Sequence, residues 1–411
     1  MTKTITDWLL DLGEKTFYSN IDWEQKVSEG VRFPQIKSRA TERIVEQMDQ
    51  HQLFIASETD DVIVREVPDP QFVQYLEENN WTLPKLIIGD YKEQLSMKSD
   101  RVLVPYLVDK EDEEFLKPNT IIGPHAELAL RLNNKVKMRK FLEEKDIRVT
   151  EGAICRSVEE IIETYRHYQG ERLVIKLPFG SSGKGLFHIR QQKELDYFIK
   201  FLKRRGIKDF EVSVEKWHDT KMSLNAQLLL WEGTVHILAI TEQKVDSSGV
   251  YRGSDLTPNL SPNLLQNYHD LLKEVGTLLL EEGYRGVLGI DSIVETDGEI
   301  IPVIEVNARL TLVTYSLPLL QRFKSEGHQK VFSCFFDYKR STPHTFDDVI
   351  HDLNKNISPT HNRGFFVYGF HKYEVEGESY TYRLFFILYG ESTLDIEEMQ
   401  DRIDSCIREE L

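Results

Sequence analysis

The chain has 411 residues and a net charge of −17, and 40% of its residues are hydrophobic. That hydrophobic content supports globular cores and excludes a disordered chain. The acidic balance argues against a general nucleic-acid binder or acidic-membrane binder, because most of the surface would repel phosphate groups. We therefore expect no nucleic-acid partner and no membrane partner, and any polyanionic ligand must meet a local basic site.

Cysteine usage and apolar runs indicate the compartment. Cys155, Cys334 and Cys406 are far apart and include no C-x-x-C pair, which argues against a disulfide framework and a structural zinc. The N-terminal stretch has acidic residues inside a brief apolar run, and no apolar run is long enough for a membrane helix. We therefore expect a cytoplasmic protein without a signal peptide or membrane span.

Four sections follow one another along the chain. Residues 1–130 mix helical patterns with short apolar runs such as QLFIAS and RVLVPYLV, which is typical of a small α/β domain. Residues 131–214 read as α+β, beginning with a helix through KVKMRKFLEEKDI that two asparagines can cap. Residues 215–335 contain strands, a long helix and a hairpin, and the aromatic strands of residues 336–411 predict a separate small α+β module of unassigned function.

The segment KLPFGSSGKG, residues 176–185, lies between the predicted strands RLVIKL and GLFHI. Only two serines separate Gly180 from the next Gly-Lys pair, so the spacing does not match a P-loop. The loop also leads into a strand, which excludes a dinucleotide-binding fingerprint. What remains is a flap over an anionic ligand, with backbone N–H groups, Lys176 and Lys184 as donors. An ordinary hairpin tip is the alternative.

The segment GVLGIDSIVETDGEIIPVIEVNARL predicts two strands around an Asp-Gly turn. The period of two on the second strand places three polar side chains on one face, those of Glu305, Asn307 and Arg309. The register decides where Asp291 of the first strand lies. A two-residue loop turns it to the other face, whereas a three-residue loop pairs it with Val303 and leaves it diagonal to Glu305.

Carboxylates and an amide oxygen are hard ligands, which suit a magnesium ion that also holds nucleotide phosphates. Asp291, Glu305 and Asn307 are therefore the candidate metal ligands, with Mg2+ as the expected ion and Mn2+ as a second candidate. The alternative is a solvated acidic edge with a surface arginine, although the apolar run IIPVIEV would then break its pattern for no reason.

A basic Gly/Ser flap followed by an acidic hairpin ending in EVNAR resembles the ATP-grasp superfamily of ligases. The resemblance covers residues 131 to about 330. It implies the ATP-grasp fold of the α+β class, in which two α+β lobes, here 131–214 and 215–335, grip one ATP. The N-terminal α/β domain precedes these lobes and the C-terminal module follows them.

The resemblance also implies roles for individual residues. Lys135 and Lys176 match the lysines that reach the phosphates, with Lys137 less favoured for the first, and the hinge strand matches the adenine site. The implied nucleotide-binding residues are Lys135, Lys176, Gly180, Ser181, Ser182, Gly183, Lys184, Gly185, Glu215, Lys216 and Trp217. Arg309 matches the arginine that faces the acyl phosphate, and Lys244 and Arg252 fall where further basic groups surround the triphosphate or substrate. One departure is Asp291, where many relatives have the longer glutamate.

The implied chemistry is ADP-forming ligation: ATP phosphorylates a carboxylate, and a nucleophile displaces phosphate from the acyl phosphate. The chain length, first domain and C-terminal addition are similar to those of antibiotic-pathway ligases, which implies L-glutamate as acyl donor and an acyl-carrier-protein thiol as acceptor. A free amino acid or peptide amine is the alternative nucleophile. A kinase and a non-catalytic nucleotide-binding module are alternatives of other classes, and the oligomeric state is not predicted.

A basic segment, YFIKFLKRRGIKDF, offers one surface to an acidic carrier protein. Its cations are Lys200, Lys203, Arg204, Arg205 and Lys208. A solvated helix end is the alternative, because lysine and arginine are favoured there by the helix dipole.

Overall fold

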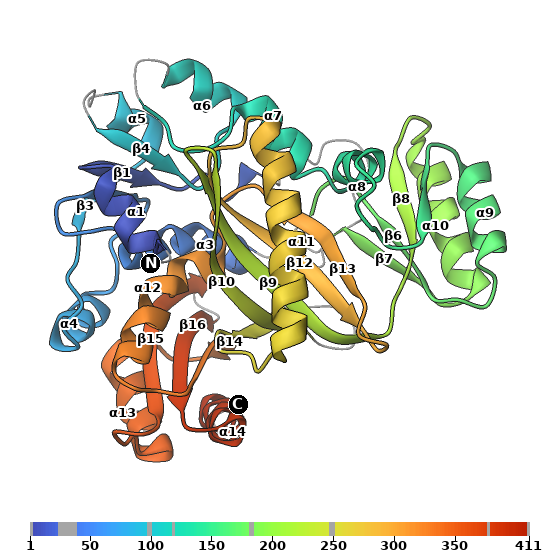
Figure 1. The fold of residues 1–411 in the computed structure, drawn as a ribbon. Helices are drawn as coiled ribbons and strands as arrows, with labels where there is room; N and C mark the ends of the chain where they lie inside the picture. The colour runs from blue at the N-terminus through green and yellow to red at the C-terminus, as the bar shows by residue number, and fades with distance from the viewer. Residues whose placement is uncertain are drawn as a thin grey trace.

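The computed structural model describes residues 3–23, 39–96, 101–116, 120–180, 185–245, 251–375 and 379–408. Its described strands form three sheets, of four, four and eight strands. Figure 1 shows the eight-stranded sheet in the middle, with one four-stranded sheet packed at the N-terminal side and the other standing apart at the right. The predicted combination of an α/β unit with α+β lobes is confirmed.

The N-terminal sheet is parallel and has the order β3-β2-β1-β4. Its strands are β1 (Lys15–Tyr18), β2 (Asp61–Val64), β3 (Lys85–Ile88) and β4 (Val102–Pro105). The connecting helices are α1 (Ile5–Asp11), α3 (Arg39–Glu46), η1 (Gln47–Phe54), α4 (Pro70–Glu78), α5 (Tyr91–Leu95) and α6 (Lys110–Phe115). Because the strands are parallel, their carboxyl ends share one edge, and ligands of such sheets bind at that edge.

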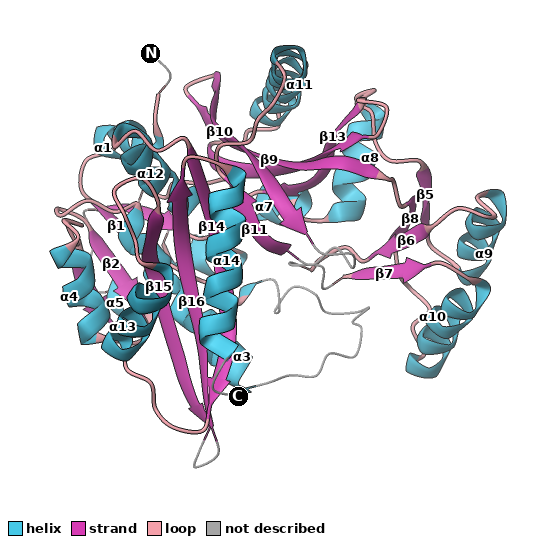
Figure 2. Cartoon of the chain, turned by 90° about the horizontal axis from the view of Figure 1, so that it is seen from below, coloured by secondary structure: helices cyan, strands magenta, loops and turns pink. Residues whose placement is uncertain are grey.

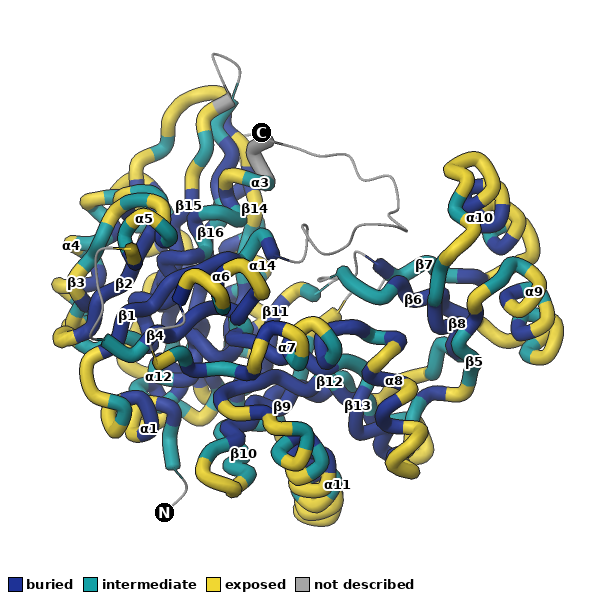
Figure 3. The backbone as a smooth tube through the Cα atoms, turned by 90° about the horizontal axis from the view of Figure 1, so that it is seen from above, coloured by how far each residue is buried: buried dark blue, intermediate teal, exposed yellow. Residues whose placement is uncertain are grey.

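The second four-stranded sheet has the order β5-β8-β6-β7 and is antiparallel. Its strands are β5 (Gly152–Cys155), β6 (Leu173–Lys176), β7 (Leu186–Ile189) and β8 (Val212–Lys216), and its helices are α9 (Val158–His167) and α10 (Gln192–Arg205). Helix α10 ends at Gly206, whose φ of 65° is the left-handed conformation that glycine adopts without strain. Figure 3 shows the outer faces of α9 and α10 exposed and the strands beneath them largely buried.

Two helices connect the N-terminal sheet to this lobe. Helix α7 spans Ala126–Leu132 and helix α8 spans Lys135–Glu144. Asn134 caps α8, because its side-chain oxygen accepts hydrogen bonds from the backbone N–H groups of Val136 and Lys137. The cap predicted for this helix is thus confirmed, and it fixes Lys135 at the first helical position.

The eight-stranded sheet has the order β13-β12-β9-β10-β11-β14-β16-β15. Its strands are β9 (Thr220–Trp231), β10 (Thr234–Val245), β11 (Tyr251–Asp255), β12 (Gly286–Glu295), β13 (Ile300–Asn307), β14 (Lys330–Arg340), β15 (Gly364–Val375) and β16 (Ser379–Gly390). Helix α11 (Pro262–Glu281) covers the β9–β10 side, and α12 (Leu312–Ser325), α13 (Phe346–Ile357) and α14 (Thr393–Arg408) complete the described helices.

The predicted C-terminal α+β section, with strands β14, β15 and β16 and helices α13 and α14, is joined to the rest of the chain. Strand β14 pairs with β11, so the C-terminal strands extend the central sheet. Their helix α13 packs on the N-terminal domain, where Phe346 contacts Phe72 and Tyr75 at ring-centroid distances of 5.4 and 5.2 Å. Helices α3 and η1 of the N-terminal domain contact β15, and Figure 2 shows α3 beside the C-terminal strands. One hydrophobic core therefore joins the two ends of the chain.

The predicted domain limits fall inside regular elements. The limit after residue 130 lies in α7, the limit after 214 lies in β8, and the limit after 335 lies in β14. Strand β8 belongs wholly to the small sheet, so Glu215 and Lys216 extend from the first lobe. Among the described residues, no helix is both long enough and apolar enough to cross a membrane.

Candidate active site

The β12–β13 hairpin brings two carboxylates face to face. Asp291 pairs directly with Glu305, and Gly289 pairs with Asn307. The predicted pairing of Asp291 with Val303 is therefore wrong, although the three-residue turn itself forms, because the Glu295 N–H donates to the Glu299 carbonyl at 2.8 Å.

A bulge next to Pro302 explains the difference in register. The pairing shifts by two residues between Asp291 and Ile293, because β13 has extra residues opposite Ser292. Proline lacks the N–H group that a regular ladder requires, so strands tolerate it at bulges. The Ser292 hydroxyl donates to the Pro302 carbonyl at 2.6 Å, which satisfies an acceptor within the irregular stretch. The bulge moves Glu305 from a diagonal position to one opposite Asp291.

Three amides surround the Asp291 carboxylate. Asn225 and Gln243 each donate to Oδ1 at 2.7 Å, and Asn307 donates to Oδ2 at 3.2 Å. Burial, and then the neighbouring charge of Glu305, raise the pKa of Asp291 to about 6. The amides stabilise the charged form only in part, so this carboxylate lacks a full counter-charge.

Lys135 is the cation that reaches the second carboxylate. Its Nζ lies 2.6 Å from Glu305 Oε1 and donates to the Gly180 carbonyl at 2.8 Å. The Lys135 side chain is only 6% exposed. A single lysine thus joins the start of α8 and the base of the Gly/Ser loop to the hairpin.

The residues present fit a magnesium ion. Asp291 and Glu305 supply carboxylate oxygens from directly opposite positions on the neighbouring strands β12 and β13, and the Asn307 side chain contacts Asp291. Its amide presents Nδ2 to Asp291 and has to turn over to offer its oxygen. Two carboxylates and one amide are too few for a closed site, so further ligands have to come from phosphate and water, as is usual for Mg2+.

A second buried cluster surrounds Glu215. Lys176 Nζ lies 2.6 Å from Glu215 Oε2, and Arg139 Nη1 lies 3.4 Å from Oε1. The hydroxyls of Thr150 and Ser213 also donate to this carboxylate. Burial alone would raise the pKa of Glu215, but Lys176 and Arg139 outweigh it and hold the pKa at about 2. The Glu215 carboxylate therefore fixes Lys176. The contact of Glu215 with adenine remains a prediction.

The hinge residues after Glu215 are held by backbone pairing. Lys216 N–H donates to the Glu151 carbonyl and Trp217 N–H donates to the Arg172 carbonyl, at 2.8 and 2.7 Å. The Trp217 ring packs edge-on against His188 of β7 at 4.5 Å. The two residues thus lie at the carboxyl end of the central strand β8, and their contact with a base stays a prediction.

The Gly/Ser loop is described only at its two ends. Ser181, Ser182, Gly183 and Lys184 lie outside the described residues. The Gly185 carbonyl accepts a hydrogen bond from the Leu177 N–H at 2.8 Å. A Cβ at Gly185 would come within 2.8 Å of the Phe179 carbonyl oxygen, so this close approach of two backbones requires glycine.

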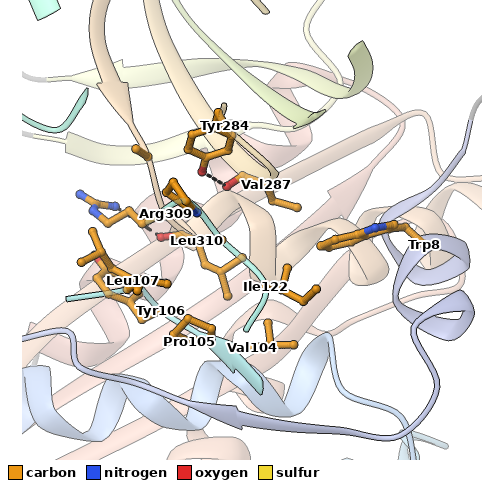
Figure 4. Close-up of a pocket in the computed structure, with 14 residues that line it drawn as sticks. Trp8, Val104, Pro105, Tyr106, Leu107, Ile122, Tyr284, Val287, Arg309 and Leu310 are labelled. Carbon is orange, nitrogen blue, oxygen red and sulfur yellow. Dashed lines mark hydrogen bonds between the residues drawn. The ribbon is translucent and has the colours of Figure 1, made fainter. Parts of the chain in front are cut away.

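Arg309 lies at the end of the hairpin and is 9% exposed. Its guanidinium carbon is 5.2 Å from the ring centre of Tyr106, at the carboxyl end of the N-terminal sheet. Figure 4 shows both side chains at one end of a small pocket, with Trp8 at the other. The charge of Arg309 lowers the pKa of Asp291, although less than burial and Glu305 raise it. Arg309 therefore lies close enough for its charge to act on Asp291, and its predicted role facing the acyl phosphate stays a prediction.

Other predicted basic groups are not brought to the carboxylates. Lys244 pairs with Glu242 at 2.7 Å. Side chains alternate along β10, so these two residues lie on the face opposite Gln243, which contacts Asp291. Arg252 and Lys137 are exposed, on β11 and α8. The predicted role of Lys244 and Arg252 around the triphosphate stays a prediction.

Sequence reasoning did not find Arg139, Asn225 and Gln243. Arg139 lies four residues after Lys135, which places both on one face of α8. Asn225 alternates with Gln227 inside the otherwise apolar strand β9, and both are buried. Buried polar residues at a spacing of two within an apolar run were the available signal.

The chain belongs to the ATP-grasp family of ligases and is an ATP-dependent ligase. The family model described as an ATP-grasp domain matches residues 132–313. A curated relative from Niallia circulans, [Butirosin acyl-carrier protein]–L-glutamate ligase, is 34% identical over 345 residues, with 82% of each chain covered.

Solved structures agree with the fold. Phosphoribosylamine–glycine ligase from Thermotoga maritima is 15% identical with a TM-score of 0.61, and 96% of each chain is covered. N5-carboxyaminoimidazole synthetase from Staphylococcus aureus, in complex with ADP, is 10% identical with a TM-score of 0.61, covering 96% of this chain and 98% of that one. At these identities the likeness is one of fold.

Proposed function

We propose that this ligase activates the carboxylate of L-glutamate and transfers the glutamyl group to the thiol of an acyl carrier protein in an antibiotic-pathway setting. The pairing of Asp291 with Glu305, beside Lys135 and Arg309, is the observation that carries the proposal. The name of the 34% identical relative supports the choice of glutamate and a carrier protein.

The proposed roles follow from the two charged clusters. Lys135 and Lys176 contact the ATP phosphates, and Glu215 holds Lys176 in place. Asp291, Glu305 and Asn307 hold magnesium, which supplies charge neutralisation at the transferred phosphoryl group when bound. Glu305 would hold that ion in place of its contact with Lys135, and Lys135 would then turn from the carboxylate toward phosphate.

The proposed reaction has two steps, phosphoryl transfer and acyl transfer. A glutamate carboxylate oxygen attacks the γ-phosphorus, the bond from γ-phosphorus to the bridging oxygen breaks, and ADP leaves. The carrier thiolate then attacks the acyl carbon, the bond from that carbon to the phosphate oxygen breaks, and inorganic phosphate leaves. Arg309 stabilises the oxyanion that forms in between, because its planar N–H donors match oxygen pairs.

An ADP-release screen of amino acids tests the acyl donor. With Mg-ATP and a holo carrier protein, glutamate is expected to stimulate ADP release more than other amino acids do. Release that requires a free amine acceptor instead of the carrier would favour the amino-acid or peptide ligase. Nucleotide binding without turnover for any acid would favour a non-catalytic module.

Helix α10 is the proposed docking surface for the acidic carrier. Lys200, Lys203, Arg204, Arg205 and Lys208 are all exposed at its carboxyl end and in the following loop. Reversing the charge of residues 203–205 to glutamate is expected to raise the apparent KM for the carrier and flatten its salt dependence, with KM for ATP nearly unchanged. Unchanged carrier kinetics would show that these cations are a solvated helix end.

A further inference from the structure

We propose that Tyr106 of the N-terminal domain is a positioning residue that holds Arg309 for acyl transfer. The inference rests on the proposed function, since it assigns Arg309 to the oxyanion. Tyr106 follows β4 at the carboxyl edge of the parallel sheet, and its ring faces the guanidinium at 5.2 Å (Figure 4). The two side chains are 8% and 9% exposed, so the contact is shielded from water.

Backbone hydrogen bonds on both sides hold Arg309. Leu310 N–H donates to the Tyr106 carbonyl at 3.2 Å, and Tyr106 N–H donates to the Tyr18 carbonyl at 2.9 Å. On the other side, Ala308 N–H donates to the Asn133 side-chain oxygen at 3.1 Å. The chain before and after Arg309 is thus tied to two other parts of the molecule. Its guanidinium Nη1 donates to the Leu310 carbonyl at 3.4 Å, so the direction of the side chain depends on that hydrogen bond as well as on the Tyr106 ring.

The Tyr106 ring contributes to that direction and accepts no conventional hydrogen bond from the guanidinium. A cation–π contact uses the face of the guanidinium and none of its five N–H groups, which lie in the plane. The surrounding pocket is lined mainly by apolar side chains, among them Pro105, Leu107 and Leu310. In such surroundings a cation–π contact is stronger than at an exposed surface, because the cation has lost part of its water.

The position of Tyr106 in the topology supports this assignment. The order β3-β2-β1-β4 changes direction between β1 and β4, and ligands of open parallel sheets bind at the carboxyl ends of the strands at such a point. Tyr106 directly follows β4 there and bonds to Tyr18, the last residue of β1. The N-terminal domain therefore contributes to the acyl-transfer step through this ring.

The test compares Tyr106→Leu with Tyr106→Phe. We expect Y106L to lose about tenfold in kcat with KM for ATP within twofold, since a desolvated cation–π contact is of that size. Y106F keeps the ring and is expected to restore most of the activity. Tyr106→Met, whose side chain is unbranched and flexible and has no ring face, replaces Y106L if that variant does not fold.

A double-mutant cycle with Arg309→Lys separates positioning from stability. If Tyr106 acts through Arg309, then Y106L adds little to the loss caused by R309K, whereas additive losses would overturn the proposal. Tyr91→Leu is the matched control, because Tyr91 is 7% exposed, stacks on Tyr18 at 4.8 Å and begins helix α5 of the same N-terminal domain. Y91L should lower the melting temperature and keep kcat; an equal kcat loss in Y91L, or in Y106F, would also overturn it.

The test of Tyr106 is kept independent of the proposed glutamate substrate by the choice of assay. The variants are assayed with whichever carboxylate gives ADP release in the wild-type enzyme. If glutamate fails and another acid works, the proposed substrate is wrong and the ratio of Y106F to Y106L still decides the role of Tyr106.

Discussion

Glu215 is a buried carboxylate and Asp291 a partly buried one, and their pKa values move in opposite directions. Glu215 has Lys176 and Arg139 against it, and its pKa falls to about 2. Asp291 has neutral amides and the like charge of Glu305 against it, and its pKa rises to about 6. Two cations lie within 3.4 Å of the Glu215 carboxylate, whereas the Asp291 carboxylate is hydrogen-bonded by amides and Lys135 contacts its neighbour Glu305 instead.

The difference between these two charge environments indicates which cluster binds a metal cation. A carboxylate that is fully paired positions its partners and gains nothing from a metal ion. A buried pair of carboxylates with one lysine gains from an added divalent cation, because the cation offsets both burial and mutual repulsion. The Glu215 cluster is therefore expected to be a support for Lys176, and the Asp291 cluster is expected to bind the ion.

The largest expected effect is the loss of activity in variants of the Asp291 cluster. Glu305→Gln and Asn307→Ala should each reduce ADP release by about a thousandfold or more, because magnesium contributes several kcal/mol at the phosphoryl-transfer step. Circular dichroism should show an intact fold. Glu299→Gln is the matched control in the same hairpin, since that side chain is 71% exposed, and it should keep full activity. Near-wild-type release by E305Q and N307A would remove the hairpin from the active site.

The next effect concerns stability. Glu215→Gln should lower the free energy of unfolding by about 3 kcal/mol, because it leaves Lys176 and Arg139 buried without their counter-ion. Asp291→Asn removes a buried charge that burial and Glu305 disfavour, so the melting temperature should stay the same or rise while activity is lost. Urea unfolding of both variants checks this, and equal destabilisation would end the distinction between the clusters.

A smaller effect is the dependence of stability on pH. The pKa of Glu215 is lower in the folded state than its usual 4.5, so the stability difference between wild type and E215Q is full above pH 4.5 and shrinks as pH falls toward 2. The pKa of Asp291 is higher than its usual 3.8, so wild type gains stability relative to D291N as pH falls from 6 to 3.8. Thermal melts of the metal-free proteins across pH 3–7 should show these opposite slopes. Parallel slopes would contradict them.

Local sequence patterns predicted much of the site. The asparagine cap placed Lys135, the apolar strand placed Lys176, and the acidic hairpin placed Asp291 and Glu305. Each of these depends on neighbours within a few residues, where capping and alternation act. The register near Asp291 was missed, because a proline bulge changes pairing without changing the pattern of apolar residues.

The contacts between segments that are far apart in the chain could not be predicted from the sequence. The amide donors of Asp291 come from β9 and β10, and only the order of strands in the sheet brings Asn225 and Gln243 to it. The C-terminal strands look like a module of their own, yet β14 pairs with β11 across a distant part of the chain. The two partners of Glu215 were also not predicted, because Lys176 and Arg139 reach it from another strand and from α8.

Trapping of the acyl phosphate tests the central claim most directly. Wild-type enzyme with Mg-ATP, L-glutamate and hydroxylamine should release ADP and form glutamyl hydroxamate in equal amounts, with neither product formed when glutamate is omitted or by E305Q. ADP release that is independent of any carboxylate, or a stable phosphorylated acceptor in place of the hydroxamate, would contradict the account.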